Sequence, residues 1–294
     1  MEMMMMIKEV HGDDDDDQRP VHHEKRFALL QATRDSEYVK KMYGGYFNVF
    51  VAAFGEEGEK WDLFMVVEGD FPELEELDSY DGFLISGSPY DAYSSEPWIL
   101  RLCFLLQILD SMAKKVLGIC FGHQVIARAL GGKVGKSDSG WDLGIRKVNI
   151  VKDLPPLVTK LLFQEETDGL DDDDDDDDDD NNVNGEIIPM IPSSFSIIEC
   201  HQDVVLEVPT GANVIAYSDK TGVEMFTIET HILGIQGHPE YTDDILNSII
   251  DRLLLNQDIQ EDLAENARNM LQKTEPDRKY LGKICRKFLK GRQI

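Results

Sequence analysis

One stretch of the sequence constrains the fold more than any other. It reads KVLGICFGHQVIARALGG and consists of a short apolar run, a cysteine with glycine two positions to either side, and a helical pattern. A strand that turns at once into a helix forces the residue at its turn into a strained backbone conformation, which requires small neighbours. Gly118 and Gly122 meet that requirement. The segment therefore predicts a strand, a sharp turn at Cys120 and a helix.

Strand-like and helical patterns alternate through the first half of the chain. Buried strands are predicted at 26–32, 62–69 and 80–87, with helices at 35–50 and 96–115. This alternation is typical of a mostly parallel sheet covered by helices on both faces.

The second half of the chain is richer in strands and ends in three helical patterns. The predicted strands are 144–151, 195–208, 213–218, 223–229 and 232–240, and the helices are 243–254, 261–271 and 277–289. All of these elements can pack on a single sheet. We therefore expect one α/β domain over 25–294.

Acidic residues are concentrated in two segments. Asp13–Asp17 and Glu165–Asp180 contain 18 of them, which leaves −10 of the formal net charge of −28 for the remainder. We expect residues 1–24 to form a disordered tail and 165–185 an acidic loop insert. The run of ten aspartates either attracts cations or a partner or is only a solvated loop, and its composition favours the second.

The net charge and the spacing of the cysteines exclude several kinds of partner and cofactor. An acidic protein without a basic stripe repels nucleic acid and anionic membranes, so neither is an expected partner. The four cysteines are scattered, with no pair at metal-ligand or redox spacing, and we expect no disulfide framework, metal or other cofactor. The N-terminus lacks a signal-peptide core, and a cytosolic location is the expectation.

Cys120 has two interpretations. At the start of a helix, the dipole and the free N–H groups favour a nucleophilic thiolate, and the N–H of Phe121 is placed to bind an oxyanion. A cysteine that ends a core strand is also often a small buried residue. The Gly-x-Cys-x-Gly pattern alone leaves both interpretations open.

A base for such a nucleophile is predicted in the segment QGHPE. His238 ends a buried strand, Pro239 keeps its backbone extended, and Glu240 lies on the same side of the chain, where its carboxylate can orient the imidazole. The alternative is an ordinary strand end that runs into a turn. His201 follows Cys200 directly, so the two side chains point to opposite faces of a strand, and His231 is expected to be exposed in a hairpin turn.

The segment LISGSP is a third candidate for the site. A buried strand ends at Gly87, and a sharp turn there would present the N–H of Ser88 as a second oxyanion donor. An ordinary strand-ending turn fits these residues equally well.

Together, GICFGHQ, ISGSP and QGHPE resemble the motifs of the class I glutamine amidotransferases. The resemblance implies a flavodoxin-like three-layer sandwich, with a mostly parallel central sheet between helices and a Cys-His-Glu triad. It implies that Cys120 is the nucleophile, His238 the base and Glu240 its orienting residue, that the N–H groups of Ser88 and Phe121 form the oxyanion hole, and that Gln124, Gln202 and Asp203 contact the amino-acid head of the substrate.

The resemblance is closer to one branch, the plant gamma-glutamyl peptidases. It covers essentially all of residues 26–292 and includes the segments YGGYFNVF, YDGFLISGSPYDAY and CHQDVVLEVP. It implies a cytosolic enzyme that removes glutamate from glutathione conjugates in sulfur-containing defence metabolism, such as glucosinolate formation. The partner is then a small-molecule substrate, with no obligatory synthase. Residues 90–93 and Trp141 are expected near the sulfur substituent.

Two other functions remain possible at this level. The chain could be a glutaminase subunit that supplies ammonia to a separate synthase, because glutamine presents the same acyl group to the nucleophile. It could also be a non-catalytic, glutamyl-binding regulatory protein.

Overall fold

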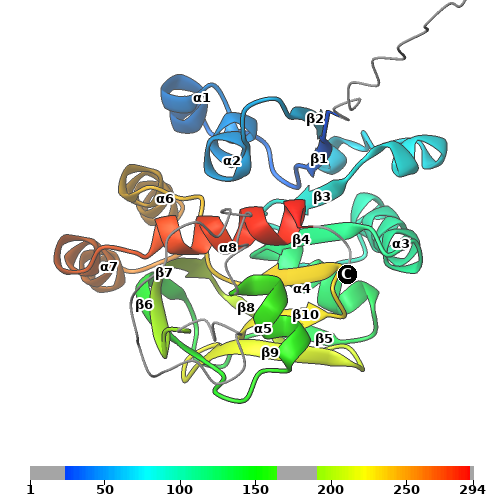
Figure 1. Ribbon diagram of the computed structural model, residues 1–294. Coiled ribbons are helices and arrows are strands. Elements are labelled where there is room, and N and C mark those ends of the chain that lie inside the picture. Colours follow the sequence, from blue (N-terminus) through cyan, green and yellow to red (C-terminus); the bar gives the residue numbers. More distant parts are fainter. Residues whose placement is uncertain (1–23, 164–190, 292–294) are drawn as a thin grey trace, which may run out of the picture.

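The computed structural model of the chain describes residues 24–163 and 191–291 (Figure 1). The predicted acidic tail, except Glu24, and the whole of the predicted acidic insert, including all ten consecutive aspartates, lie outside the described residues. Among the helices that are described, none combines the length and the apolar character needed to cross a membrane.

A nine-stranded sheet forms the centre of the molecule, in the order β2-β1-β3-β4-β11-β10-β9-β6-β7. Its strands are β1 (Arg26–Leu30), β2 (Lys60–Phe64), β3 (Gly82–Ile85), β4 (Lys115–Ile119), β6 (Asp142–Ile150), β7 (Ser194–His201), β9 (Ala212–Ser218), β10 (Gly222–Ile228) and β11 (Ile232–Ile235). The strands from β2 to β11 in that order run parallel, and the remaining pairs are antiparallel. The predicted fold class is confirmed.

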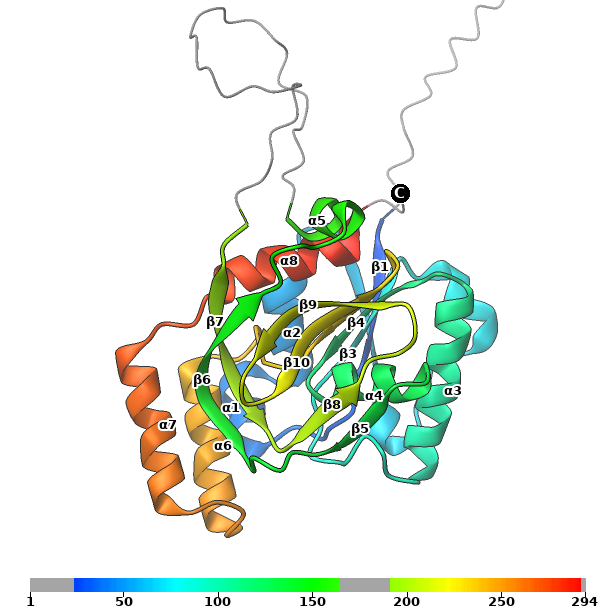
Figure 2. The ribbon, with the colours of Figure 1, turned by 90° about the horizontal axis from the view of Figure 1, so that it is seen from below.

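Helices cover both faces of this sheet (Figures 1 and 2). The helices are α1 (Glu37–Tyr43), α2 (Tyr46–Phe54), α3 (Pro97–Ser111), α4 (Phe121–Ala129), α5 (Pro156–Leu162), α6 (Asp243–Leu255), α7 (Glu261–Lys273) and α8 (Arg278–Lys290). Alternate side chains of β1 enter opposite cores: Phe27 and Leu29 pack with α1, α2 and α5–α8, whereas Ala28 and Leu30 pack with α3 and α4.

A second, two-stranded sheet corrects the expectation of a single sheet. The predicted strand 195–208 is divided into β7 and β8 (Asp203–Glu207), and β8 pairs antiparallel with β5 (Lys133–Lys136). The chain changes sheets at Gln202, whose carbonyl accepts a hydrogen bond from the N–H of Ser137 at 2.9 Å. Apolar residues lie on both sides of this change, and the polar residues His201, Gln202 and Asp203 between them were not recognised as a break.

Other differences concern element boundaries. The predicted helix 35–50 is two helices, because Gly44 and Gly45 take positive φ angles of 76° and 119° between them. The predicted strand 62–69 begins earlier, at β2, and its second half is a 3₁₀ turn (Val66–Glu68). Helix α5 and a second 3₁₀ segment (Leu74–Ser79) were not predicted.

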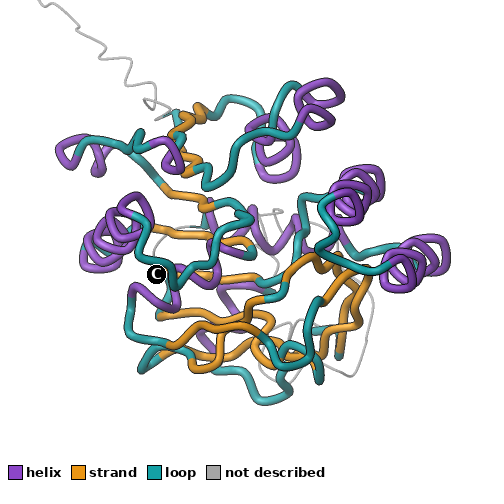
Figure 3. Tube along the Cα trace, turned by 180° about the vertical axis from the view of Figure 1, so that it is seen from behind, coloured by secondary structure: helices purple, strands orange, loops and turns teal. Residues whose placement is uncertain are grey.

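The three sequence motifs meet at one edge of the sheet. Strands β3, β4 and β11 are adjacent and parallel, with Ile85 beside Gly118 and Ile235 beside Ile119. Their carboxyl ends therefore lie side by side. Figure 3 shows from behind that the strands lie in the middle of the molecule with helices on either side. Ligands bind characteristically at this edge of parallel sheets.

Candidate active site

Cys120 stands at the sharp turn between β4 and α4. Its backbone angles are φ 53° and ψ −103°, a conformation that costs energy for any residue with a side chain. A Cβ atom on Gly118 would lie 2.5 Å from the carbonyl carbon of Gly122, and one on Gly122 would lie 2.5 Å from the carbonyl oxygen of Ile85. Both glycines are required because the backbone of the turn packs directly against its neighbours.

His238 and Glu240 form a buried hydrogen-bonded pair. Nδ1 of His238 is 2.7 Å from Oε1 of Glu240, and the two residues are 2% and 1% exposed. The N–H of His238 donates to the carbonyl of Ile198 at 2.8 Å, which fixes the start of the segment to β7. With a carboxylate accepting at Nδ1, the nitrogen left to take a proton from the nucleophile is Nε2.

Gly87 brings the three motifs together. A Cβ atom at this position would lie 2.9 Å from Cε1 of His238, 3.8 Å from its Nε2 and 3.7 Å from Cβ of Cys120. The imidazole and the cysteine therefore flank the same glycine. Any side chain at Gly87 would occupy the space between them.

A pocket of about 180 Å³ opens at this point. It is lined by six of the residues predicted from the sequence or its resemblance: Cys120, His238, Ser88, Gln124, Gln202 and Asp203. Glu240 lies behind His238 and Phe121 adjoins Cys120, so all eight predicted residues gather around one space. Their roles in the reaction remain predictions.

The protonation state of Cys120 differs from the expectation. Burial raises the pKa of its thiol well above the usual value, and the carboxylate of Glu240 raises it further, whereas the N–H of Phe121 lowers it. The thiol form is therefore favoured over the expected thiolate. Removal of the proton has to accompany attack on the substrate.

Two N–H groups beside the cysteine are placed as oxyanion donors. Phe121 is the first residue of α4, where backbone N–H groups have no partner within the helix. The N–H of Ser88 donates no hydrogen bond to any residue in the described ranges, although the Ser88 hydroxyl accepts one from Tyr90 at 3.2 Å. Both donors are consistent with the predicted oxyanion hole.

Two hydrogen bonds hold the side-chain amide of Gln124 through its nitrogen. Its Nε2 donates to the carbonyl of Asp203 at 2.8 Å and to Oε1 of Gln236 at 3.1 Å. Its own Oε1 accepts no hydrogen bond from the described part of the chain. This oxygen can accept a hydrogen bond from the ammonium group of an amino acid.

The Asp203 side chain adds negative charge to the same pocket. Burial and the adjacent carboxylate of Asp91 raise the pKa of Asp203 to about 6, so it is mostly ionised at neutral pH. The hydroxyl of Tyr93 lies 3.4 Å from its Oδ1. Asp203 thus provides the kind of charge that an α-ammonium group requires.

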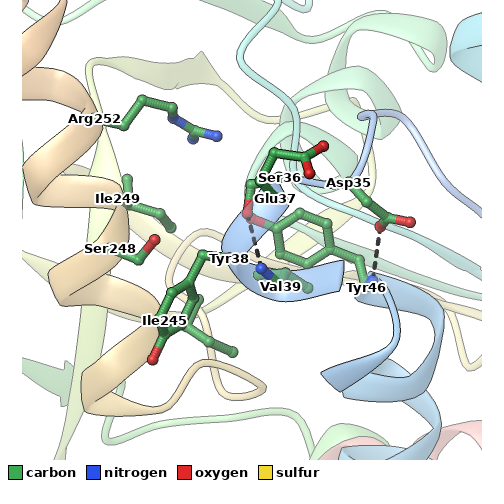
Figure 4. A pocket seen from close by; sticks show the side chains of 10 residues that line it. All are labelled: Asp35, Ser36, Glu37, Tyr38, Val39, Tyr46, Ile245, Ser248, Ile249 and Arg252. Carbon is green, nitrogen blue, oxygen red and sulfur yellow. Dashed lines mark hydrogen bonds between the residues drawn. The ribbon is translucent and has the colours of Figure 1, made fainter. Parts of the chain in front are cut away.

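A second pocket of about 420 Å³ adjoins the first, between α1 and α6 (Figure 4). Tyr46, Ile249 and Arg252 line both pockets. Figure 4 shows the guanidinium group of Arg252 extending from α6 toward the beginning of α1. Among the described residues that line the two pockets, Arg252 is the only lysine or arginine, and it makes no ion pair with a described carboxylate.

Several pocket residues were not predicted from the sequence. Tyr241 stacks on His238 and could have been proposed because it follows GHPE directly, whereas Tyr46 and Arg252 carry no local signal. His201 also lines the pocket. The prediction for His231 is wrong: it is 4% exposed, with Nε2 2.8 Å from a carboxylate oxygen of Asp110 on α3.

The family model for glutamine amidotransferase class-I matches residues 39–250. The chain belongs to this family. Within the family, the chain is 48% identical to gamma-glutamyl peptidase 5 of Arabidopsis thaliana over 272 residues, which cover 92% of this chain and 98% of the peptidase. It is also 48% identical to gamma-glutamyl peptidase 3 of the same plant, over 92% of this chain and 99% of that protein. The chain therefore belongs to the gamma-glutamyl peptidase branch and is a hydrolase.

Solved structures of glutamine amidotransferases share the fold. The one from Thermotoga maritima gives a TM-score of 0.62 at 18% identity and covers 92% of this chain and 100% of its own. The one from Methylobacillus flagellatus gives 0.58 at 17% identity, covering 92% and 96%. At these identities the likeness concerns the fold alone.

Proposed function

We propose that this protein is a cysteine-dependent gamma-glutamyl peptidase that hydrolyses glutathione conjugates to glutamate and a Cys-Gly conjugate. Its 48% identity to two gamma-glutamyl peptidases over 92% of the chain supports the gamma-glutamyl specificity. As part of the same proposal, the reaction takes place in the cytosol, without a synthase partner, in sulfur-containing defence metabolism such as glucosinolate formation.

The proposed reaction begins with attack by Cys120. As its sulfur bonds to the gamma-carbonyl carbon, its proton passes to Nε2 of His238, and Glu240 stabilises the resulting imidazolium. The oxyanion accepts hydrogen bonds from the N–H groups of Ser88 and Phe121. Because burial favours the thiol of Cys120, this base is needed for the first step.

The second half of the proposed reaction releases the two products. His238 returns the proton to the departing amine, the C–N bond breaks, and a thioester remains on Cys120. His238 then removes a proton from a water molecule, which attacks the thioester and releases glutamate. The cysteine recovers its proton at the end of the cycle.

The amino-acid head of the substrate is proposed to bind beside Gln124. The free Oε1 of Gln124 and the carboxylate of Asp203 are suited to the α-ammonium group. Glutamine and gamma-glutamyl peptides share this head, so these residues do not distinguish the two substrates.

The observation that carries the proposal is the second pocket, which provides space for a large leaving group. Ammonia, the leaving group of glutamine, requires no such space. The Cys-Gly part of glutathione ends in a carboxylate, which a guanidinium binds well. Other charges in the pocket are already engaged: Asp35 accepts hydrogen bonds from the N–H of Tyr46 and from Gln31, and Glu37 pairs with Lys40 at 3.2 Å. Arg252 is left to bind that carboxylate.

One experiment separates the proposed function from its alternatives. The purified protein is offered glutathione, an S-substituted glutathione and glutamine in parallel, and the products are identified by mass spectrometry. Glutamate together with a Cys-Gly conjugate is expected, and Cys120→Ala provides the inactive control. Turnover of glutamine alone, to glutamate and ammonia, would assign a glutaminase subunit instead, and binding without turnover would assign a regulatory protein.

A further inference from the structure

A group of buried polar side chains on β7 and β10 includes His201, which lines the pocket. Glu199 on β7 and Glu224 on β10 are 0% and 2% exposed. Oε2 of Glu199 lies 3.2 Å from Nε2 of His201, and Oε1 of Glu224 accepts a hydrogen bond from the hydroxyl of Ser218 at 2.5 Å. In the described part of the chain, neither glutamate forms an ion pair with a lysine or an arginine.

The nearby cations are engaged by a different carboxylate. Asp142 on β6 pairs with Arg146, lies 4.0 Å from Nζ of Lys220, and accepts a hydrogen bond from the hydroxyl of Thr221 at 3.2 Å. A buried carboxylate without a counter-charge is far more stable in its protonated form. Burial, reinforced by the charge of Asp142, raises the pKa of Glu199 well above its usual value, and burial also raises the pKa of Glu224 to about 9.

The tautomer of His201 determines whether Glu199 must donate a hydrogen bond. Its Nδ1 lies 3.0 Å from the carbonyl oxygen of Asp203, so this nitrogen carries the hydrogen. Burial lowers the pKa of His201, so the imidazole is neutral and Nε2 is an acceptor. Nε2 of His201 and both carboxylate oxygens of Glu199 are buried without a hydrogen-bond partner among the described residues. A proton on the oxygen that lies 3.2 Å from Nε2 would supply the donor that Nε2 lacks.

The backbone carbonyl of Asp203 connects this group of buried side chains to the proposed binding site. The carbonyl oxygen of Asp203 accepts from His201 and, at 2.8 Å, from Nε2 of Gln124. Gln124 and Asp203 line the pocket where the amino-acid head is proposed to bind. A change in the orientation of His201 would therefore move both groups.

We propose that Glu199 is a neutral carboxylic acid that positions the glutamyl-head pocket: its O–H donates to Nε2 of His201, which holds its Nδ1–H on the Asp203 carbonyl and thereby fixes Gln124. The inference deepens the proposed function and rests on it for the identity of the head. Glu199 touches no substrate and is a positioning residue.

Two substitutions test the role in positioning. In Glu199→Gln, the amide N–H replaces the acid O–H as donor to His201, whereas Glu199→Leu has similar size and no donor. Loss of the donor is expected to raise KM for S-substituted glutathione about tenfold with kcat within about threefold, and the glutamine variant should restore KM to within about threefold of wild type. Equal damage from both substitutions, or a loss confined to kcat, would overturn the proposal.

A second measurement reports the charge of Glu199 without any substrate. An anion at this position raises the pKa of Cys120. The rate of Cys120 alkylation by iodoacetamide is compared at pH 7 to 8, below the pH at which this thiol ionises, in wild type and Glu199→Gln, with peptide mapping to separate the other cysteines. The other titratable and charged groups around Glu199 are the same in both proteins: Asp142, Glu224, Arg146, His201 and Cys200. If Glu199 is neutral, the two rates coincide.

Faster alkylation of Cys120 in Glu199→Gln would show that Glu199 is ionised in the wild type and would overturn the inference. This comparison holds even if Glu199→Leu does not fold. The proposed function fails separately: wild-type protein that does not cleave gamma-glutamyl substrates, with coinciding alkylation rates, contradicts the peptidase assignment and leaves the neutral acid supported.

Discussion

The imidazole of His238 lies flat on the ring of Tyr241, with ring centroids 3.9 Å apart and planes 5° apart. The hydrogen bond to Glu240 fixes Nδ1, and the stacked ring limits rotation about that bond. Tyr241→Ala is expected to lower kcat by about tenfold or more, because the base is then less well oriented. Tyr241→Phe keeps the stack and should stay within about threefold. Steady-state kinetics check both, and equal losses would contradict a role for stacking.

Cys120 gives a prediction that separates stability from activity. Its φ of 53° suits glycine, so Cys120→Gly is expected to have a free energy of unfolding about 1 kcal/mol above that of Cys120→Ala. At an ordinary position glycine is the less stable of the two. Both variants should lose at least about 10³-fold in turnover. Urea unfolding measures the difference, and a more stable alanine variant would contradict strain at the turn.

Arg252 should distinguish peptide substrates from glutamine. Because glutamine has no leaving-group carboxylate, Arg252→Gln is expected to raise KM for glutathione about tenfold or more with little change for glutamine. Ser248→Ala, on the same helix and in the same pocket, is the matched control. Kinetics with both substrates provide the measurement. Equal effects on the two substrates would contradict binding of the leaving-group carboxylate by Arg252.

Asp203 predicts a pH dependence of substrate binding. Its pKa of about 6 means that the carboxylate is charged above that pH and neutral below it, so attraction for the α-ammonium group weakens as pH falls. Binding of S-substituted glutathione to the Cys120→Ala variant should weaken by up to about tenfold per pH unit below 6. Adding Asp203→Asn should remove most of this dependence, because the titrating carboxylate is then absent. Calorimetry at pH 5 to 8 measures both, and parallel profiles would contradict the assignment.

The sequence predicts the fold, and it predicts which segments meet at the candidate site, because these signals are local. The glycines around Cys120 indicate a sharp turn. Proline after His238 indicates an extended backbone, which places Glu240 on the same side of the chain as His238. Parallel strands then bring the segments to one edge of the sheet.

The sequence-based predictions that proved wrong concern interactions between distant segments of the chain. The pairing of β5 with β8 and the burial of His231 against Asp110 depend on residues far away in the chain. Arg252 meets the pocket only because α6 packs beside it. The thiolate expectation for Cys120 counted the helix dipole, but desolvation by the surrounding core has the larger effect.

The central claim is a glutamyl thioester on Cys120, and trapping that intermediate tests it most directly. Wild-type protein is mixed with S-substituted glutathione labelled in the glutamyl group, quenched in acid before the first turnover is complete, and digested for mass spectrometry. We expect the label on the peptide that contains Cys120, together with release of one equivalent of the Cys-Gly conjugate. Formation of that conjugate with no label on Cys120 would contradict the account.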